Sequence, residues 1–107
     1  MKMLTAIVQA KDTADVCQAL SESGIEFTKM ATSGGFLRSG NTTLLIGLAD
    51  ERVDEAIEII RKNCRKRMEK VPAMMTTAMP MAVPHTAEVA VGGAIVFVTD
   101  VVRFEKM

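Results

Sequence analysis

The stretch Met3–Gln9, which reads MLTAIVQ, is a nearly continuous apolar run close to the start of the chain. A run this short indicates a β-strand covered on both faces, because a strand with one face in water alternates apolar and polar side chains. A helical pattern follows, for which Asp12 or Thr13 is a suitable N-terminal cap and Gly24 a natural left-handed stop. The inward face of this helix is expected to consist of Val16, Ala19 and Leu20, flanked by Cys17.

The middle of the chain repeats this order with one strand more. Strands are predicted at Ile25–Ala31 and Thr42–Ala49, joined by a small glycine-rich loop, residues 32–41, that reads TSGGFLRSGN. A second helix is expected to open at Asp50, with acidic residues at its start and basic residues at its end, which complements the helix dipole. Three- and four-residue spacing places its apolar side chains in one stripe: Val53, Ala56, Ile57, Ile60 and Cys64.

The C-terminal third differs in composition. Residues 68–86 hold three prolines and several methionines, which indicates a long loop. A strand with alternating side chains is predicted at Ala87–Val91, a tight turn or bulge at Gly92-Gly93, and a last, strongly apolar strand at Ala94–Val102.

The order of elements predicts the fold class. A βαββαβ arrangement with one extra C-terminal strand is typical of an α+β, ferredoxin-like fold, with two helices on one face of an antiparallel sheet. We expect residues 1–107 to form a single domain of this kind. The first, third and last strands are apolar on both faces, so another body must cover the face that lacks helices. Self-association is the simplest source of that cover.

Composition and charge exclude several classes of function. The formal net charge is zero, from 13 basic and 13 acidic side chains, so no nucleic-acid partner is expected. No apolar run reaches the roughly 20 residues that span a bilayer, and no signal-peptide pattern opens the chain, so no membrane insertion is expected. Cys17 and Cys64 lie far apart in helical patterns, which favours a reduced, cytoplasmic setting.

Residues for catalysis are also missing from the sequence. His85 is the only histidine, so a cluster of several histidine metal ligands is excluded, and we expect His85 to be a polar residue where the long loop enters a strand. The acidic residues that open the second helix are explained by the helix dipole. We therefore expect a non-enzyme, with no catalytic residues, no metal and no cofactor.

The glycine-rich loop has the chemistry of a nucleotide site. Gly34, Gly35 and Gly40 allow backbone amides to converge on an anion, and Arg38 could meet a phosphate. Phe36 is one of four aromatic residues and could stack on a base. Asn41 offers both a donor and an acceptor. The alternative is an ordinary hairpin loop whose Phe36 packs into the core; the loop is no Walker motif, since GxxxxGK[ST] is missing.

A resemblance adds to this pattern. Residues 28–43, which read TKMATSGGFLRSGNTT, resemble the signature of the PII-like cyclic di-AMP receptor family of Gram-positive bacteria. Further similar stretches are IVQ at 7–9, DERV at 50–53 and VAVGGAIVFV at 89–98. The similarity runs in the same order along essentially the whole chain.

The resemblance implies a homotrimer of ferredoxin-like subunits that binds cyclic di-AMP in the clefts between them. Phe36 would stack on an adenine, and binding would reshape the loops at 32–40 and 68–86 and so signal to an unknown downstream protein. By position in the family motif, the ligand-binding residues would be Thr28, Gly35, Phe36, Leu37, Asn41, Gly47 and Phe97.

Three stretches depart from the family pattern, one of them in the long loop, where Met74–Met79 (MMTTAM) replaces a more polar, glycine-containing stretch. Glu26 stands where the family carries an Arg, and Glu105-Lys106 replaces a Gln contact near the C-terminus. Two alternatives therefore stay open: a PII-like sensor of another adenine nucleotide, and a trimeric interaction scaffold with a vestigial pocket.

Overall fold

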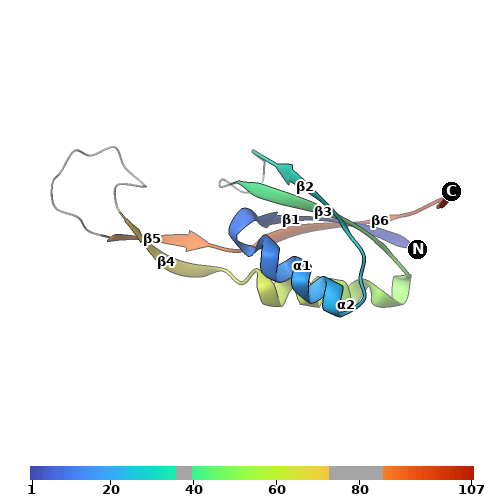
Figure 1. Cartoon of the computed structure of the whole chain (residues 1–107), viewed down its shortest axis with the longest axis horizontal. Coiled ribbons are helices and arrows are strands. Elements are labelled where there is room, and N and C mark those ends of the chain that lie inside the picture. The colour runs from blue at the N-terminus through green and yellow to red at the C-terminus, as the bar shows by residue number, and fades with distance from the viewer. Residues whose placement is uncertain (36–39, 73–85) are drawn as a thin grey trace.

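The computed structural model describes residues 1–35, 40–72 and 86–107. Four strands form an antiparallel sheet in the order β2-β3-β1-β6. Two helices, α1 and α2, lie on one face of this sheet, as Figure 1 shows. The strands of the sheet are β1 (Lys2–Gln9), β2 (Thr28–Thr32), β3 (Asn41–Leu48) and β6 (Ala94–Asp100). This α+β arrangement is consistent with the predicted ferredoxin-like fold.

Each helix follows a short 3₁₀ turn. The turn η1 (Ala10–Asp12) precedes α1 (Thr13–Glu22), and η2 (Asp50–Arg52) precedes α2 (Val53–Asn63). Gly24 has a φ of 73° just after α1, which confirms the predicted left-handed stop. Asp12 stands at the N-cap position of α1 but makes no side-chain cap hydrogen bond. Its carboxylate instead binds Arg67, a residue far along the chain.

The core lies between the helices and one face of the sheet. Alternate side chains of β1 and β3 point into it, and the helices contribute the apolar stripes predicted from their spacing. Of the residues predicted for the first helix, Ala19 and Cys17 are half-buried at the margin of this core. Fully buried side chains include Leu4, Ala6, Val8, Val16, Leu20, Leu44, Ile46 and Ala56.

Within the described residues, no helix covers the opposite face of the sheet, which we call the open face (Figure 1). Strand register places Thr5 of β1 beside Leu45 of β3 and Phe97 of β6, and Leu45 beside Thr28 of β2. Paired residues of antiparallel strands share a face, and side chains along a strand alternate between faces. The open face is therefore partly apolar. Its apolar members are Met3, Ile7, Met30, Leu45, Ile95 and Phe97.

Two predictions for the C-terminal third are wrong. Part of the expected loop at 68–86 is a strand, β4 (Arg67–Pro72), which pairs with β5 (Thr86–Val91) as a separate two-stranded ribbon. The last strand, β6, is no addition to the sheet but its fourth strand, beside β1. The alternation of side chains in β5 indicated a strand correctly, but alternation does not specify which strand is the partner.

The ribbon projects from one end of the sheet, away from the N- and C-termini (Figure 1). Gly92 and Gly93 join it to β6 with φ values of 90° and 88°, as the predicted turn or bulge requires. Within the described residues, no helix combines the length and the apolar character that crossing a bilayer requires.

Candidate functional site

Four predicted ligand-binding residues lie on strands, and all four belong to the open face. Thr28 pairs with Leu45, and Phe97 pairs with Thr5, both open-face positions. Asn41 and Gly47 alternate along β3 with side chains that point toward the helices, which places them on the same face. The structure therefore brings these residues to one surface, although they are up to 69 positions apart in the sequence, from 28 to 97.

Thr28 and Phe97 nevertheless lie at opposite edges of that surface. They share one rung of the sheet, which runs from Thr28 through Leu45 and Thr5 to Phe97. Three strand spacings separate them, or about 14 Å. One adenine ring is too small to contact both residues of the same subunit.

The glycine-rich loop is described at its two ends. Gly34 and Gly35 have φ values of 74° and 73°, and no atom of the described residues lies within 4 Å of where a Cβ would stand on either. Asn41 is 5% exposed, and its side-chain Nδ2 donates to the carbonyl oxygen of Gly34 at 2.9 Å. Asn41 therefore holds the loop through its amide group. Phe36 and Leu37 lie outside the described residues.

Threonine hydroxyls support the same loop. The hydroxyls of Thr32 and Thr43 share a hydrogen bond of 2.9 Å across β2 and β3. On the other face of β3, the Thr13 hydroxyl donates to the Thr42 hydroxyl at 2.8 Å. Hydrogen bonds on both faces therefore hold the loop-proximal end of β3 in place.

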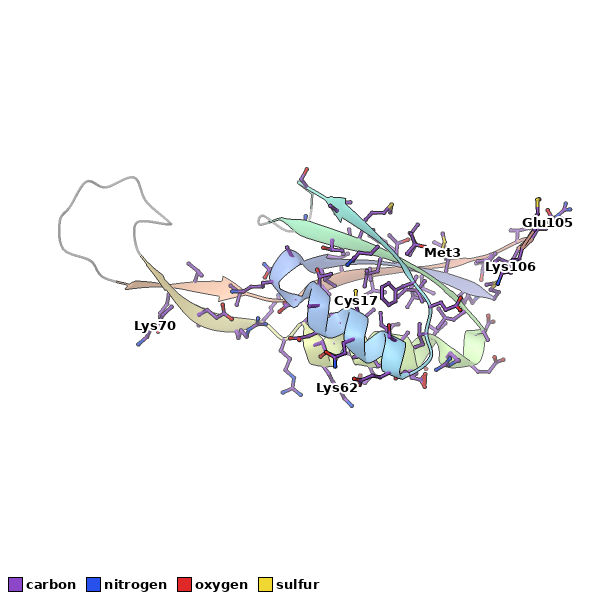
Figure 2. The ribbon with its side chains drawn as sticks, in the orientation of Figure 1. Met3, Cys17, Lys62, Lys70, Glu105 and Lys106 are labelled. Atoms are coloured by element: carbon purple, nitrogen blue, oxygen red, sulfur yellow. The ribbon has the colours of Figure 1, made fainter. Side chains whose placement is uncertain are left out.

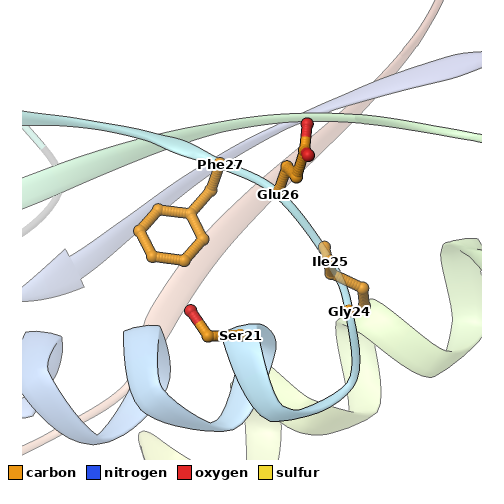
Figure 3. A pocket seen from close by; sticks show the side chains of 5 residues that line it. All are labelled: Ser21, Gly24, Ile25, Glu26 and Phe27. Atoms are coloured by element: carbon orange, nitrogen blue, oxygen red, sulfur yellow. The ribbon is translucent and has the colours of Figure 1, made fainter.

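Glu26 lies beside the predicted site, in the segment that leads into β2. Its side chain points away from α1, whereas Phe27 points toward that helix (Figure 3). It lines a shallow hollow of about 220 Å³ together with Gly47 and Arg52. Arg52, which also lines the hollow, already has partners for its guanidinium: it donates to the Ser23 carbonyl at 2.7 Å and pairs with Glu55. The carboxylate of Glu26 therefore gives this hollow an acidic wall.

Ion pairs cluster at the end of β1 near Gly47. The N-terminal ammonium lies 2.9 Å from Asp50, and this hydrogen bond holds the pKa of the Asp50 carboxyl below its ordinary value. Lys2 pairs with Asp100, which raises the pKa of the lysine. These groups are exposed, so their net effect on stability is small.

The two cysteines are free thiols. Cys64 is buried, and burial raises its pKa to about 12, while Cys17 is half-buried with a pKa that burial also raises. A thiol with a raised pKa is a poor nucleophile. No set of three histidine, cysteine or acidic side chains suited to a metal ion occurs in the described parts of the chain.

One group of residues had no signal in the sequence. Arg67 at the start of β4 donates to Asp12 at 2.9 Å and to Glu69 at 3.1 Å, and Glu69 also pairs with Lys11. Asp12 and Arg67 are 55 positions apart. Nothing in local spacing relates them, because only the folded chain places β4 beside η1.

The fold and the arrangement of the open face define the class: an α+β protein consistent with a ferredoxin-like fold, with a glycine-rich loop at one end of its sheet. A solved structure of the same class is the crystal structure of a functionally unknown protein from Pediococcus pentosaceus ATCC 25745. The two chains are 39% identical and superpose with a TM-score of 0.79, over 99% of this chain and 96% of the other.

The family model for cyclic-di-AMP receptors matches residues 1–107, which is the whole chain. The chain belongs to the cyclic-di-AMP receptor family, as its resemblance in residues 28–43 predicted.

Proposed function

We propose that this protein is a non-enzymatic, cytoplasmic receptor for cyclic di-AMP that acts as a homotrimer. The observation that carries the proposal is the match of the whole chain to the cyclic-di-AMP receptor family. The gathering of Thr28, Asn41, Gly47 and Phe97 on the open face supports it. Gly35, Phe36 and Leu37 complete the proposed ligand-binding set from the glycine-rich loop.

The ligand is proposed to bind between subunits. Thr28 and Phe97 lie at opposite edges of the open face, about 14 Å apart by strand spacing. If the β2 edge of one subunit meets the β6 edge of a neighbour, both residues can contact one ligand. Three such contacts close a ring, which is the symmetry expected of a homotrimer. In such a trimer, neighbouring subunits would cover the partly apolar open face, which is uncovered in a single subunit.

Recognition would combine stacking with backbone contacts. Phe36 is proposed to stack on an adenine, and the amides around Gly34 and Gly35 to face a phosphate, since both glycines have the positive φ that lets successive amides converge. Glu26 opposes a second phosphate contact on its side of the site. The bound nucleotide is proposed to change the exposed surface of the loops and so to signal to a downstream protein.

A calorimetric titration with cyclic di-AMP, cyclic di-GMP, ATP and AMP tests this function. We expect three equivalent sites per trimer, selective for cyclic di-AMP. Phe36→Ala should weaken binding by roughly 1–3 kcal/mol, the size of one base–aromatic stack. Phe27→Leu is the matched control, because Phe27 points toward α1 and should leave the affinity unchanged.

The same titration separates the alternatives. Preference for ATP or AMP would identify a sensor of another adenine nucleotide, the alternative that applies if Glu26 excludes the second phosphate of cyclic di-AMP. If a stable trimer binds none of these nucleotides, the interaction scaffold is the alternative that remains. Wild-type affinity in Phe36→Ala would remove the stacking role.

A further inference from the structure

We propose that the turn η1 couples the glycine-rich loop to the β4–β5 ribbon, with Asp12 as the residue that positions the ribbon. The coupling is a property of the folded chain itself. Its use as a ligand signal rests on the proposed function above.

On one side, η1 contacts the end of the glycine-rich loop. The backbone amide of Ala10 donates to the carbonyl oxygen of Gly40 at 2.8 Å. The preceding residue, Gln9, pairs with Asn41 in the ladder between β1 and β3. Asn41 in turn binds the carbonyl of Gly34. A change at Gly40 therefore acts directly on the start of η1, and a change at Gly34 acts on it through Asn41 and Gln9.

On the other side, η1 contacts the base of the ribbon. Asp12 accepts from Arg67 at 2.9 Å, and Lys11 pairs with Glu69. Gln9 also takes part, because its side-chain oxygen accepts from the backbone amide of Gly92 at 2.6 Å. The three consecutive residues of η1 are therefore bonded to the loop through Ala10 and to the ribbon through Lys11 and Asp12.

Asp12 is the most constrained of these groups. It is 2% exposed, and within the described residues its Oδ2 oxygen has no hydrogen-bond partner, so Arg67 is the cation that compensates its charge. A buried carboxylate depends strongly on such a partner. The same contact raises the pKa of Arg67, and the pairing with Lys11 lowers the pKa of Glu69. The position of Arg67, and with it the start of β4, therefore follows the position of Asp12.

The ribbon is sensitive to this contact because of its architecture. An isolated pair of strands is only marginally stable in water. Its far end lies well away from the helices, whereas its base adjoins η1 (Figure 1). At that base the backbones of Gly92 and Arg65 approach closely, since a Cβ on Gly92 would stand 2.1 Å from the carbonyl oxygen of Arg65. A shift of η1 is therefore transmitted to the ribbon as a change of its position at the base.

The ligand-free protein tests the coupling. Amide hydrogen exchange, followed residue by residue by NMR, should show the Ala10 amide exchanging at least about fivefold faster in Arg67→Ala than in the wild type, the lower end of typical coupling. The Leu44 amide in the central β3 strand reports the loss of global stability and should accelerate less than the Ala10 amide. In Arg67→Lys, which retains the charge, the exchange rate of the Ala10 amide should lie between the rates in the wild type and in Arg67→Ala. Arg61→Ala, which removes an exposed ion pair with Glu58 on α2, is the matched control and should match the wild type.

Two results would overturn the coupling. An unchanged Ala10 amide in Arg67→Ala would show that the ribbon and the loop are independent. Equal acceleration at Ala10 and Leu44 would assign the ion pair to general stability alone. If Arg67→Ala does not fold, Glu69→Gln gives the same test, because it weakens the contacts to Lys11 and Arg67 at a partly exposed carboxylate. In Glu69→Gln we expect a smaller acceleration of exchange at the Ala10 amide. The absence of any acceleration would overturn the proposal.

The signal is tested by adding cyclic di-AMP at saturation. In the wild type, the exchange rates of the backbone amides in the β4–β5 ladder should differ at least about fivefold between the ligand-free and the saturated protein. In Asp12→Asn this change should disappear while calorimetry still shows binding, and in Asp12→Glu it should partly return. Binding without any change in the wild-type ribbon would overturn the signal. No binding at all would overturn the proposed function, and the ligand-free exchange would still decide the coupling.

Discussion

The two faces of the same sheet differ in how completely they are covered. On the helix side, Leu4, Val8, Leu44 and Ile46 have no exposed surface. On the open face, the neighbouring positions on the same sheet include Met3, Met30 and Phe97, which are 37%, 41% and 45% exposed.

The difference shows that the chain packs the helix side of its sheet and leaves large apolar side chains of the open face exposed. The helix side is a closed core, with the two helices packed over it. The open face mixes threonine hydroxyls with large apolar side chains, a composition suited to contact with another protein surface. A third group of apolar residues extends past the sheet altogether. Val102 and Phe104 are exposed in the C-terminal segment, whose last residues, including Glu105 and Lys106, lie beyond β1 and β6 (Figure 2).

The largest expected effect comes from a paired test of adjacent residues in β3. Leu44→Ala removes a fully buried side chain from the helix side and should lower the free energy of unfolding by about 2–5 kcal/mol. Leu45→Ala, on the open face, should lower the free energy of unfolding by less than half as much. Urea unfolding at one fixed subunit concentration measures both, since the stability of an oligomer depends on concentration. Equal losses would contradict the distinction between the faces.

A charge on the open face should weaken self-association. Met30→Asp places a carboxylate where the proposed trimer buries apolar surface, which is unfavourable without a partner. We expect association to weaken at least about tenfold, or about 1.4 kcal/mol, as measured by sedimentation equilibrium. Ala31→Asp is the matched control, because it adds the same charge to the same strand on the other face. If both variants associated equally, the open face would not be the interface.

The smallest effect concerns Cys64, which is buried on the helix side. Burial raises the pKa of its thiol to about 12, from 9.0 for an unperturbed thiol. The folded state therefore holds this proton more tightly than the unfolded chain does. Its contribution to stability is complete below pH 9 and is lost as the pH rises from 9 toward about 12.

Replacing this thiol should flatten the alkaline side of the stability curve. At pH 10 the wild type should have lost about 1 kcal/mol more than Cys64→Ala, relative to each protein at pH 7. Urea unfolding across this pH range measures the difference, with Cys17→Ala as a control for the half-buried thiol. Parallel curves for the wild type and Cys64→Ala would show that water reaches Cys64.

The sequence was sufficient to predict the elements of the four-stranded sheet and its helices. Helical periodicity identified Val16 and Leu20 in α1 and Ala56 and Ile60 in α2, all of which are buried. These predictions succeed because the spacing of apolar side chains depends only on local geometry. The β4–β5 ribbon was missed. The start of β4 is charged, and its pairing with β5 depends on contacts distant in sequence.

The candidate site divides in the same way. The glycine-rich motif and the resemblance around residues 28–43 were visible in the sequence, and the family they predicted is confirmed. The common location of Thr28, Asn41, Gly47 and Phe97 on the open face required the strand register, since a shift of one residue would reverse the face of every side chain in a strand. The roles of these residues in binding remain predictions.

By itself, the sequence determined the family, the two helices, the strands of the four-stranded sheet and the glycine-rich loop, because each follows from a pattern along the chain. Only the tertiary structure decided that β6 is the fourth strand of the sheet and that β4 and β5 form a separate ribbon. It also decided that Asp12 binds Arg67 instead of capping α1. The physical reason is the same in each case. A strand or a buried charge can have several possible partners in a sequence, and packing of the whole chain selects among them.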